Sequence, residues 1–269
     1  MTPADRIARF LFGFYMVAFF VYLFAPLAIM AAATFNTSRF PTVIPWQGTT
    51  LNWFVELARD RAMWQSVWTS LVVAFFVVVV SLPIGTAAAL ILTSLHARAR
   101  GFLYALMVSP LLTPGVVIGI STLVLWRQLS VGGGIFLIVV AQSSFIICYV
   151  MLMVAARLQR FDRTQEEAAL GLGASKVMVF RRVLLPFLRP ALIAAAFLAI
   201  LQSIENYNTT LFVRGFDTPL TVFIATKVRT GLTPAVNALA LIMIAITILG
   251  AVAYEIARRR QAAAKAAAA

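Results

Sequence analysis

The chain has 269 residues, of which 62% are hydrophobic and only 12% are charged. Soluble domains are about half apolar and a quarter charged, so this composition excludes an ordinary soluble protein and predicts one embedded in lipid. The net charge of +13 does not indicate nucleic-acid binding, because the basic residues flank apolar blocks along the whole chain.

Six blocks of sequence are nearly free of Asp, Glu, Lys and Arg. Five lack these residues altogether, and the fifth block in chain order contains a single one, Glu205. Each block reaches the roughly 20 residues that a helix needs to cross the hydrocarbon. An all-α integral membrane protein with about six transmembrane helices is therefore predicted. The blocks are residues 10–38, 62–97, 101–126, 128–156, 191–213 and 230–254.

The basic residues predict the orientation of these spans. With the amino terminus placed in the cytoplasm, 15 of the 22 Lys and Arg residues fall in the inner segments. This is the positive-inside pattern, and it predicts that both termini are cytoplasmic and that the inner face contacts anionic lipid headgroups. The two arginines before the first span favour a retained helix over a cleaved signal peptide.

Residues 1–35 are expected to form a cytoplasmic tail and the first span, and residues 36–66 a periplasmic segment. In that segment apolar residues recur at helical spacing, which predicts an amphipathic helix lying on the membrane surface. Contact of this helix with an external protein is compatible with that position. The repeat consists of Leu51, Phe54, Val55 and Ala58.

Residues 67–257 are expected to form the transmembrane core, and residues 258–269 a cytoplasmic tail. The third span, 102–126, contains Pro110 and Pro114. In lipid, proline breaks persist only where neighbouring helices or water satisfy the freed carbonyl groups. We therefore expect the third span to lie against the core of the bundle.

The segment 157–189 is too densely charged to cross a membrane and is expected in the cytoplasm. Thr164 and Glu167 have the spacing of a capping box, which predicts the start of a helix. Two glycines then permit a sharp turn, and a second helical stretch over 174–183 is expected to end at Pro186. These features fit an interfacial helix pair that only links two spans as well as they fit a docking surface.

The same segment resembles the EAA signature of ABC importer permeases. That signature reads E-A-A, three residues, G, nine residues, I, one residue and L-P. The chain matches it with Glu167-Ala168-Ala169, Gly173, Val183 and Leu185-Pro186, where valine replaces isoleucine. The likeness extends over about residues 46–257 and looks closest to the second permease subunit of spermidine/putrescine importers (PotC-type).

This resemblance implies the type I ABC importer permease fold, and a non-catalytic transport subunit of the bacterial inner membrane. Short coupling helices would contact a cytoplasmic ABC ATPase dimer that binds ATP and magnesium, so no cofactor is expected in this chain. The expected partners also include a second homologous permease, forming a heterodimer, and a periplasmic solute-binding protein. The residues implied in coupling are Glu166, Glu167, Ala168, Ala169, Gly173 and Pro186.

The fifth span carries the single intramembrane charge, Glu205. A carboxylate there costs roughly 2.5 kcal/mol or more unless it faces water or a partner, which favours a functional role. On a continuous helix, Gln202, Asn206 and Thr209 would share its face, and with Glu205 and Tyr207 they are expected to line the substrate path. The alternative is a buried polar contact that holds two helices together. Pro110, Thr113, Trp126 and Gln142 are expected to serve helix packing rather than the path.

Polyamine-type subunits resemble this region as Ser-Leu-Asp-Asp, where this chain has Ser203-Ile204-Glu205-Asn206. The resemblance implies a polyamine substrate, and the loss of one acid leaves open another amine, an amino-acid-like solute or an organic anion. A secondary transporter is the rival class, but it would show internal repeats and several intramembrane ionisable groups. A membrane-embedded enzyme would need a nucleophile–base pair or metal ligands, and the chain has one cysteine and one histidine.

Overall fold

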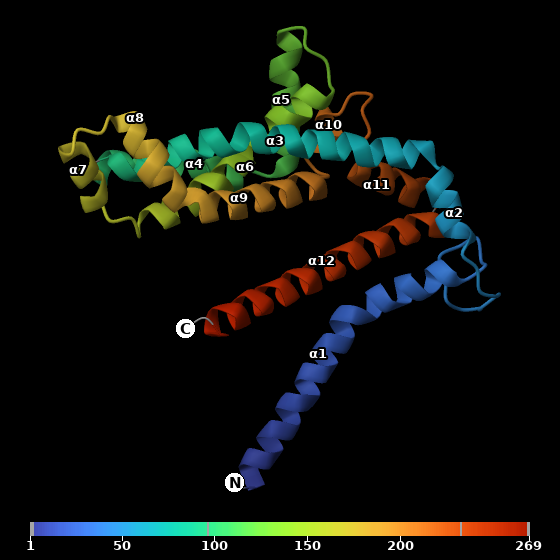
Figure 1. Ribbon diagram of the computed structural model, residues 1–269. Coiled ribbons are helices and arrows are strands. Elements are labelled where there is room, and N and C mark those ends of the chain that lie inside the picture. Colours follow the sequence, from blue (N-terminus) through green and yellow to red (C-terminus); the bar gives the residue numbers. More distant parts are fainter. Residues whose placement is uncertain (1–2, 96, 232, 268–269) are drawn as a thin grey trace. The chain divides into compact units, whose positions relative to one another are not determined.

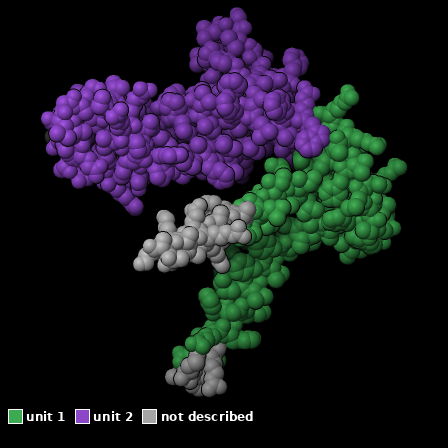
Figure 2. All heavy atoms as spheres, in the orientation of Figure 1, with its two compact units in different colours: residues 1–61, 226–269 green, residues 62–225 purple. Residues whose placement is uncertain are grey.

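The computed structural model describes residues 3–95, 97–231 and 233–267. Within these ranges the secondary structure is helical, apart from one isolated bridge between Asn36 and Thr49. The predicted all-α class is therefore confirmed. The chain divides into two compact units, Met1–Arg61 with Thr226–Ala269, and Ala62–Ala225 (Figure 2).

The first unit contains α1 (Pro3–Phe35), α2 (Asn52–Arg59) and α12 (Pro234–Ala267), and α12 contacts both others. The loop between α1 and α2 folds around the buried side chain of Asn36. Its Oδ1 accepts hydrogen bonds from the backbone N–H groups of Ser38 and Gln47, and its Nδ2 donates to the carbonyls of Thr42 and Pro45. The amide thus satisfies a loop that has little regular structure of its own.

The second unit holds the remaining helices, and α11 contains the boundary between the two units (Figure 1). These elements are α3 (Arg61–Ser94), α4 (Ala97–Leu112), α5 (Gly115–Gln128), α6 (Ile135–Leu158), α7 (Thr164–Gly171), α8 (Lys176–Val179), a π-helical turn η1 (Phe180–Leu184), α9 (Leu185–Glu205), α10 (Thr210–Val213) and α11 (Leu220–Thr230).

Helix α6 is the centre of this unit. One core cluster joins its amino-terminal half to α3 and α9 through Ile138, Val77 and Ala199, and a second joins its carboxyl-terminal half to them through Val154, Leu92 and Leu188. Because α6 is apolar on all sides, it is buried against neighbours rather than amphipathic. It therefore holds α3, α4, α5 and α9 around one axis.

Four helical stretches are long and apolar enough to cross a membrane: α1 from Ile7, α3, α6 and the continuous rod Lys176–Glu205. The bent pair α4 and α5 makes a fifth if it counts as one span, and α12 contributes a shorter apolar stretch, Pro234–Gly250. The third span is broken at its prolines, since α4 and α5 meet at 98°. Pro114 precedes α5 and lacks the N–H that would continue α4.

The fifth span also differs from the expectation at both ends. No helix ends at Pro186, because α8, η1 and α9 run on as one rod. The π-helical turn inserts an extra residue before Pro186, which then occupies the first turn of α9, where its missing N–H costs little. At the other end, α9 stops at Glu205 instead of continuing to Val213.

Candidate functional site

Four of the six candidate coupling residues lie on α7, whereas Gly173 follows that helix and Pro186 lies on α9. Every residue of α7 is at least partly exposed, and Glu166, Glu167 and Ala168 are exposed. Leu172 just after α7 is 90% exposed, and Val177 on α8 is 66% exposed. Large exposed apolar side chains beside a charged segment are typical of a protein-contact surface. Figure 1 shows α7 and α8 at the end of α3 and α6 opposite α10.

The start of α7 is built by Asp162, and the predicted capping box is wrong. The Asp162 carboxylate accepts hydrogen bonds from the hydroxyl of Thr164 at 2.7 Å and from its backbone N–H at 3.0 Å. The N-cap position is Arg163, and the N–H of Glu167 donates to the Arg163 carbonyl instead of to the Thr164 hydroxyl. The hydroxyl bond first, and then the backbone bond, lower the pKa of Asp162, so its carboxylate stays ionised at neutral pH.

The end of α7 explains the spacing between the alanine pair and Gly173. The N–H of Gly173 donates to the carbonyl of Leu170 at 2.9 Å, and the N–H of Ala174 donates to that of Ala169 at 3.1 Å. These two bonds form a Schellman motif, which requires a left-handed residue at the position of Gly173. Its φ is +84°, as glycine permits. The Ala169–Gly173 spacing therefore fixes where α7 stops.

The two ends of the 157–189 segment are held together. Arg157 on α6 donates from Nε to the carbonyl of Phe187 on α9 at 3.2 Å, and its guanidinium carbon lies 4.2 Å from the centre of the Phe187 ring. Phe161 packs on the other side of this contact, with ring centres 5.0 Å apart. Pro186 lies beside this neck and is itself exposed. The segment between the ends projects as a closed loop.

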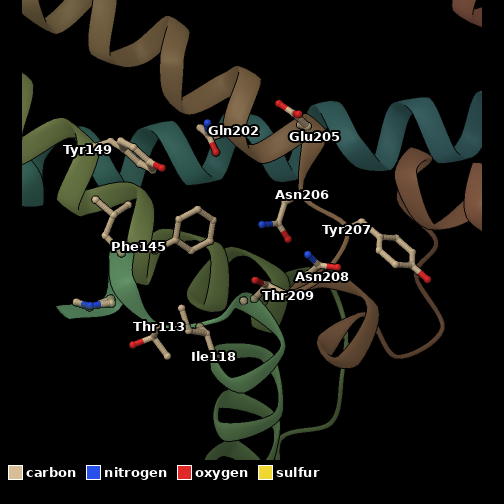
Figure 3. A pocket seen from close by; sticks show the side chains of 13 residues that line it. Thr113, Ile118, Phe145, Tyr149, Gln202, Glu205, Asn206, Tyr207, Asn208 and Thr209 are labelled. Carbon is tan, nitrogen blue, oxygen red and sulfur yellow. The ribbon is translucent and has the colours of Figure 1, made fainter. Parts of the chain in front are cut away.

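The candidate path residues line a cavity of about 330 Å³ in the second unit (Figure 3). All five of them, Gln202, Glu205, Asn206, Tyr207 and Thr209, contribute to its wall. Pro110 and Thr113 line it too, whereas Trp126 and Gln142 do not, so the packing expectation holds only for the latter two. The wall also includes Leu111, Gly115, Ile118, Phe145, Tyr149 and Asn208.

Glu205 is the last residue of α9, and its side chain is exposed. The carboxylate forms neither a hydrogen bond nor an ion pair with another residue of the described chain. The prediction that Gln202, Asn206 and Thr209 share one helix face with it is wrong, because Asn206 has extended dihedrals and ends the helix. A helix carboxyl end carries partial negative charge, so Glu205 adds a full charge to a site that already attracts cations.

A buried polar network fixes the break after Glu205. The hydroxyl of Ser203 donates to Oε1 of Gln142 at 2.6 Å, and Nε2 of Gln142 donates to the Thr210 hydroxyl at 2.8 Å. That hydroxyl donates in turn to Oδ1 of Asn206 at 3.0 Å. Because these bonds join Gln142 of α6, Ser203 of α9 and Thr210 of α10 to Asn206, the helix end is held rigidly. Gln142 and Ser203 therefore position the cavity wall from behind.

Two glycines on α5 bring the cavity wall close to that helix. A Cβ on Gly115 would lie 2.8 Å from the Thr209 hydroxyl, and one on Gly119 would lie 2.6 Å from the Thr209 carbonyl. This contact was not predicted from the sequence, although Gly115 and Gly119 form the G-x-x-x-G spacing of close helix contacts in membranes. Phe145 and Tyr149 were not predicted either, and their spacing of four residues on α6 is the available signal.

Known proteins resemble this chain in sequence and in fold. Residues 81–263 match the family described as binding-protein-dependent transport system inner membrane component. The chain is 34% identical over 252 residues to the putrescine transport system permease protein PotI of Escherichia coli (strain K12), covering 90% of this chain and 89% of PotI. It is 32% identical over 256 residues to the spermidine/putrescine transport system permease protein PotC of the same strain, covering 94% and 96%.

A solved structure agrees in fold. The crystal structure of a bacterial ABC transporter involved in the import of the acidic polysaccharide alginate superposes with a TM-score of 0.71 at 17% identity, over 95% of this chain and 98% of that one. The family match covers well over half of the sequence, and the helices are apolar enough to cross the membrane. The chain therefore belongs to the binding-protein-dependent transport system inner membrane component family, and it is a non-catalytic permease subunit of an ABC importer in the inner membrane.

Proposed function

We propose that this subunit imports a polyamine or a related small organic cation, and that α7 docks on a cytoplasmic ABC ATPase dimer. In this proposal the ATPase binds ATP and magnesium. A second homologous permease completes a heterodimer, and a periplasmic binding protein delivers the substrate. The chain crosses the membrane six times, with both termini and the 157–189 segment in the cytoplasm. In this proposal residues 1–35 form a cytoplasmic tail and the first span, residues 36–66 a periplasmic segment, residues 67–257 the transmembrane core and residues 258–269 a cytoplasmic tail.

The observation that carries the docking proposal is the exposure of α7. Glu166, Glu167 and Ala168 are exposed within the described chain, and the last two belong to the EAA signature. The Schellman motif at Gly173 and the aromatic contact beside Pro186 give this surface a defined shape. A surface that is held in a defined shape and left exposed is best explained by a partner that covers it.

The cation preference rests on the charges around the cavity. Glu205 and the carboxyl end of α9 are both negative, and the uncharged wall presents the amides of Gln202, Asn206 and Asn208. Such a site attracts an ammonium group and repels a carboxylate or phosphonate. The permeases PotI and PotC are named for putrescine and spermidine, which agrees with this charge pattern. Imported organic anions are the second candidate, and the same pattern disfavours them.

Docking is tested by co-expressing the chain with the ATPase and second permease of its importer. Glu167→Arg reverses a charge at the centre of the exposed surface, so we expect the ATPase to be lost from the purified complex while membrane insertion is unchanged. Glu56→Arg, on the exposed face of α2, is the matched control and should retain the ATPase. Equal recovery of the ATPase with both variants would refute docking through α7.

The substrate class is tested by uptake of radiolabelled putrescine, spermidine and a neutral solute. Glu205→Gln keeps the shape of the cavity and removes its charge, so polyamine uptake should fall roughly tenfold, the size expected for a lost charge-assisted contact. Glu56→Gln serves as the control. If neither polyamine is taken up by the unmodified importer, the polyamine assignment is wrong while the docking result stands.

A further inference from the structure

We propose that Arg163 is a positioning residue that ties the start of α7 to the end of α3, so that movement of the ATPase-docking surface reaches α3 directly. This inference rests on the proposed docking through α7. It concerns a residue outside the EAA signature, and the contact that carries it joins positions 70 residues apart in the sequence.

Arg163 takes part in two structures at once. Its backbone carbonyl accepts hydrogen bonds from the N–H groups of Glu166 at 3.0 Å and Glu167 at 3.1 Å, which makes it the residue on which α7 starts. Its guanidinium Nη2 donates to the carbonyl of Thr93 in the last turn of α3 at 3.0 Å. Because one residue makes both contacts, the first turn of α7 cannot move away from α3 without breaking a hydrogen bond.

The contact with Thr93 is favourable for two physical reasons. The last four carbonyls of a helix lack intrahelical partners, and the Arg163 guanidinium satisfies one of them. A helix carboxyl end also carries partial negative charge, which attracts a cation. The Thr93 hydroxyl bonds instead to the carbonyl of Ala89 at 2.9 Å, so it does not compete for the same position. The carbonyl is thus left free for the arginine.

Arg163 gives the start of α7 a direct hydrogen bond to α3. The neck formed by Arg157, Phe161 and Phe187 links the segment to α6 and α9, and Phe187 also packs against the core cluster that includes Leu92 of α3. The exposed Arg163 side chain links α7 itself to α3. With the neck and the Arg163 hydrogen bond both in place, α7 moves as one body with α3, α6 and α9. Without the Arg163 bond, α7 can pivot about the neck. Rigid transmission of this kind fits a rocking motion of packed helices.

Arg160 provides a matched control. It lies three residues earlier in the same segment and is also exposed, but its side chain makes none of the hydrogen bonds found among the described residues. Arg160→Gln and Arg163→Gln therefore remove the same charge from the same loop, and only the second removes the contact with α3. Arg163→Lys keeps the charge and a hydrogen-bond donor, so it should retain most of the contact with α3.

The test measures the distance between α3 and α7 by pulsed electron paramagnetic resonance. Spin labels are attached at Ser94→Cys and Gln165→Cys in a Cys148→Ala background, in the complex with the second permease and the ATPase. Distances are recorded without nucleotide, and with ATP bound to an ATPase variant that cannot hydrolyse it. The unmodified loop and Arg160→Gln should give the same distance distribution in both states, because α7 and α3 move together.

In Arg163→Gln, the population of a second, longer distance should rise about two- to fivefold in the ATP-bound state, as expected for loss of a charged contact at a helix end. Transport per ATP should fall with it, while ATPase recovery is unchanged. Identical distributions in Arg163→Gln and Arg160→Gln, with the ATPase retained, would overturn this inference alone. A parental complex that lacks the ATPase would overturn the docking proposal together with it.

Discussion

At the scale of single residues, Asn206 links the fold to the charge of the cavity. Its Oδ1 accepts hydrogen bonds from the N–H of Thr210 at 3.2 Å and from the Thr210 hydroxyl at 3.0 Å, and these bonds hold the chain where α9 ends. The rest of its amide lies at the cavity wall beside Glu205 (Figure 3). An aspartate at position 206 would accept the same two bonds, because a carboxylate and an amide both accept through an oxygen. It would also add a second negative charge beside Glu205.

Asn206→Asp should therefore improve uptake of a dication. With the fold kept, the KM for putrescine is expected to fall about fivefold, which corresponds to about 1 kcal/mol for a partly exposed charge pair, while a neutral solute is unaffected. Asn206→Ala, which loses the acceptor for Thr210, should instead lower the melting temperature of the purified complex. Uptake and melting temperature that fall together in Asn206→Asp would show that the amide itself is required.

The part of the candidate site that was predictable from the sequence is the part whose residue type is energetically costly inside a membrane. Glu205 stands out because an intramembrane charge needs a reason, and its neighbours are polar. The role of Asn206 as a helix end was not predictable, because it depends on Thr210 and Gln142, which is 64 residues away in the printed sequence. Local spacing predicts a helix through 206, and the tertiary hydrogen bonds override it.

At the scale of elements, the docking surface depends on where α7 ends. Gly173 has a φ of +84°, and a Cβ there would meet nothing within 4 Å, so the cost of a side chain is conformational and not steric. Gly173→Ala should destabilise the turn by about 1–2 kcal/mol, the cost of a left-handed non-glycine residue. Hydrogen exchange of the amides over 170–174 should rise accordingly, and ATPase recovery should fall.

Gly171→Ala is the matched control for this turn. Gly171 is the last helical residue of α7, and a Cβ there also meets nothing within 4 Å. Alanine is favoured over glycine in a helix by about 1 kcal/mol, so this variant should slow exchange in the same segment. Equal effects of the two substitutions would contradict a Schellman motif at Gly173.

Element boundaries follow from sequence where local chemistry decides them. The apolar blocks gave α1, α3 and α6 because continuous apolar runs have one stable form in lipid. The π-helical turn before Pro186 and the 98° bend at Pro114 did not follow. A proline predicts that a helix is interrupted, but whether the chain bends or continues depends on what packs around it, and Gly119 against Thr209 is part of that environment.

At the scale of the whole molecule, the bend between α4 and α5 decides the topology. A broken span carries the chain across the membrane, and a re-entrant loop returns it to the side from which it came. Only a crossing places the glycine turn at 132 outside and then, after α6, the 157–189 segment in the cytoplasm where an ATPase can reach it. The same crossing is predicted by the positive-inside pattern of the basic residues.

Labelling of single cysteines with a membrane-impermeant maleimide distinguishes the two arrangements. The native Cys148 is buried and is replaced by alanine. Gly132→Cys, where a side chain meets nothing within 4 Å, should react in intact spheroplasts, and Gln165→Cys, which is exposed on α7, should react only after the membrane is permeabilised. Protection of Gly132→Cys with reaction of Gln165→Cys in intact spheroplasts would mean that α4 and α5 form a re-entrant loop. That arrangement would leave α7 outside the cell, where no ATPase can bind it.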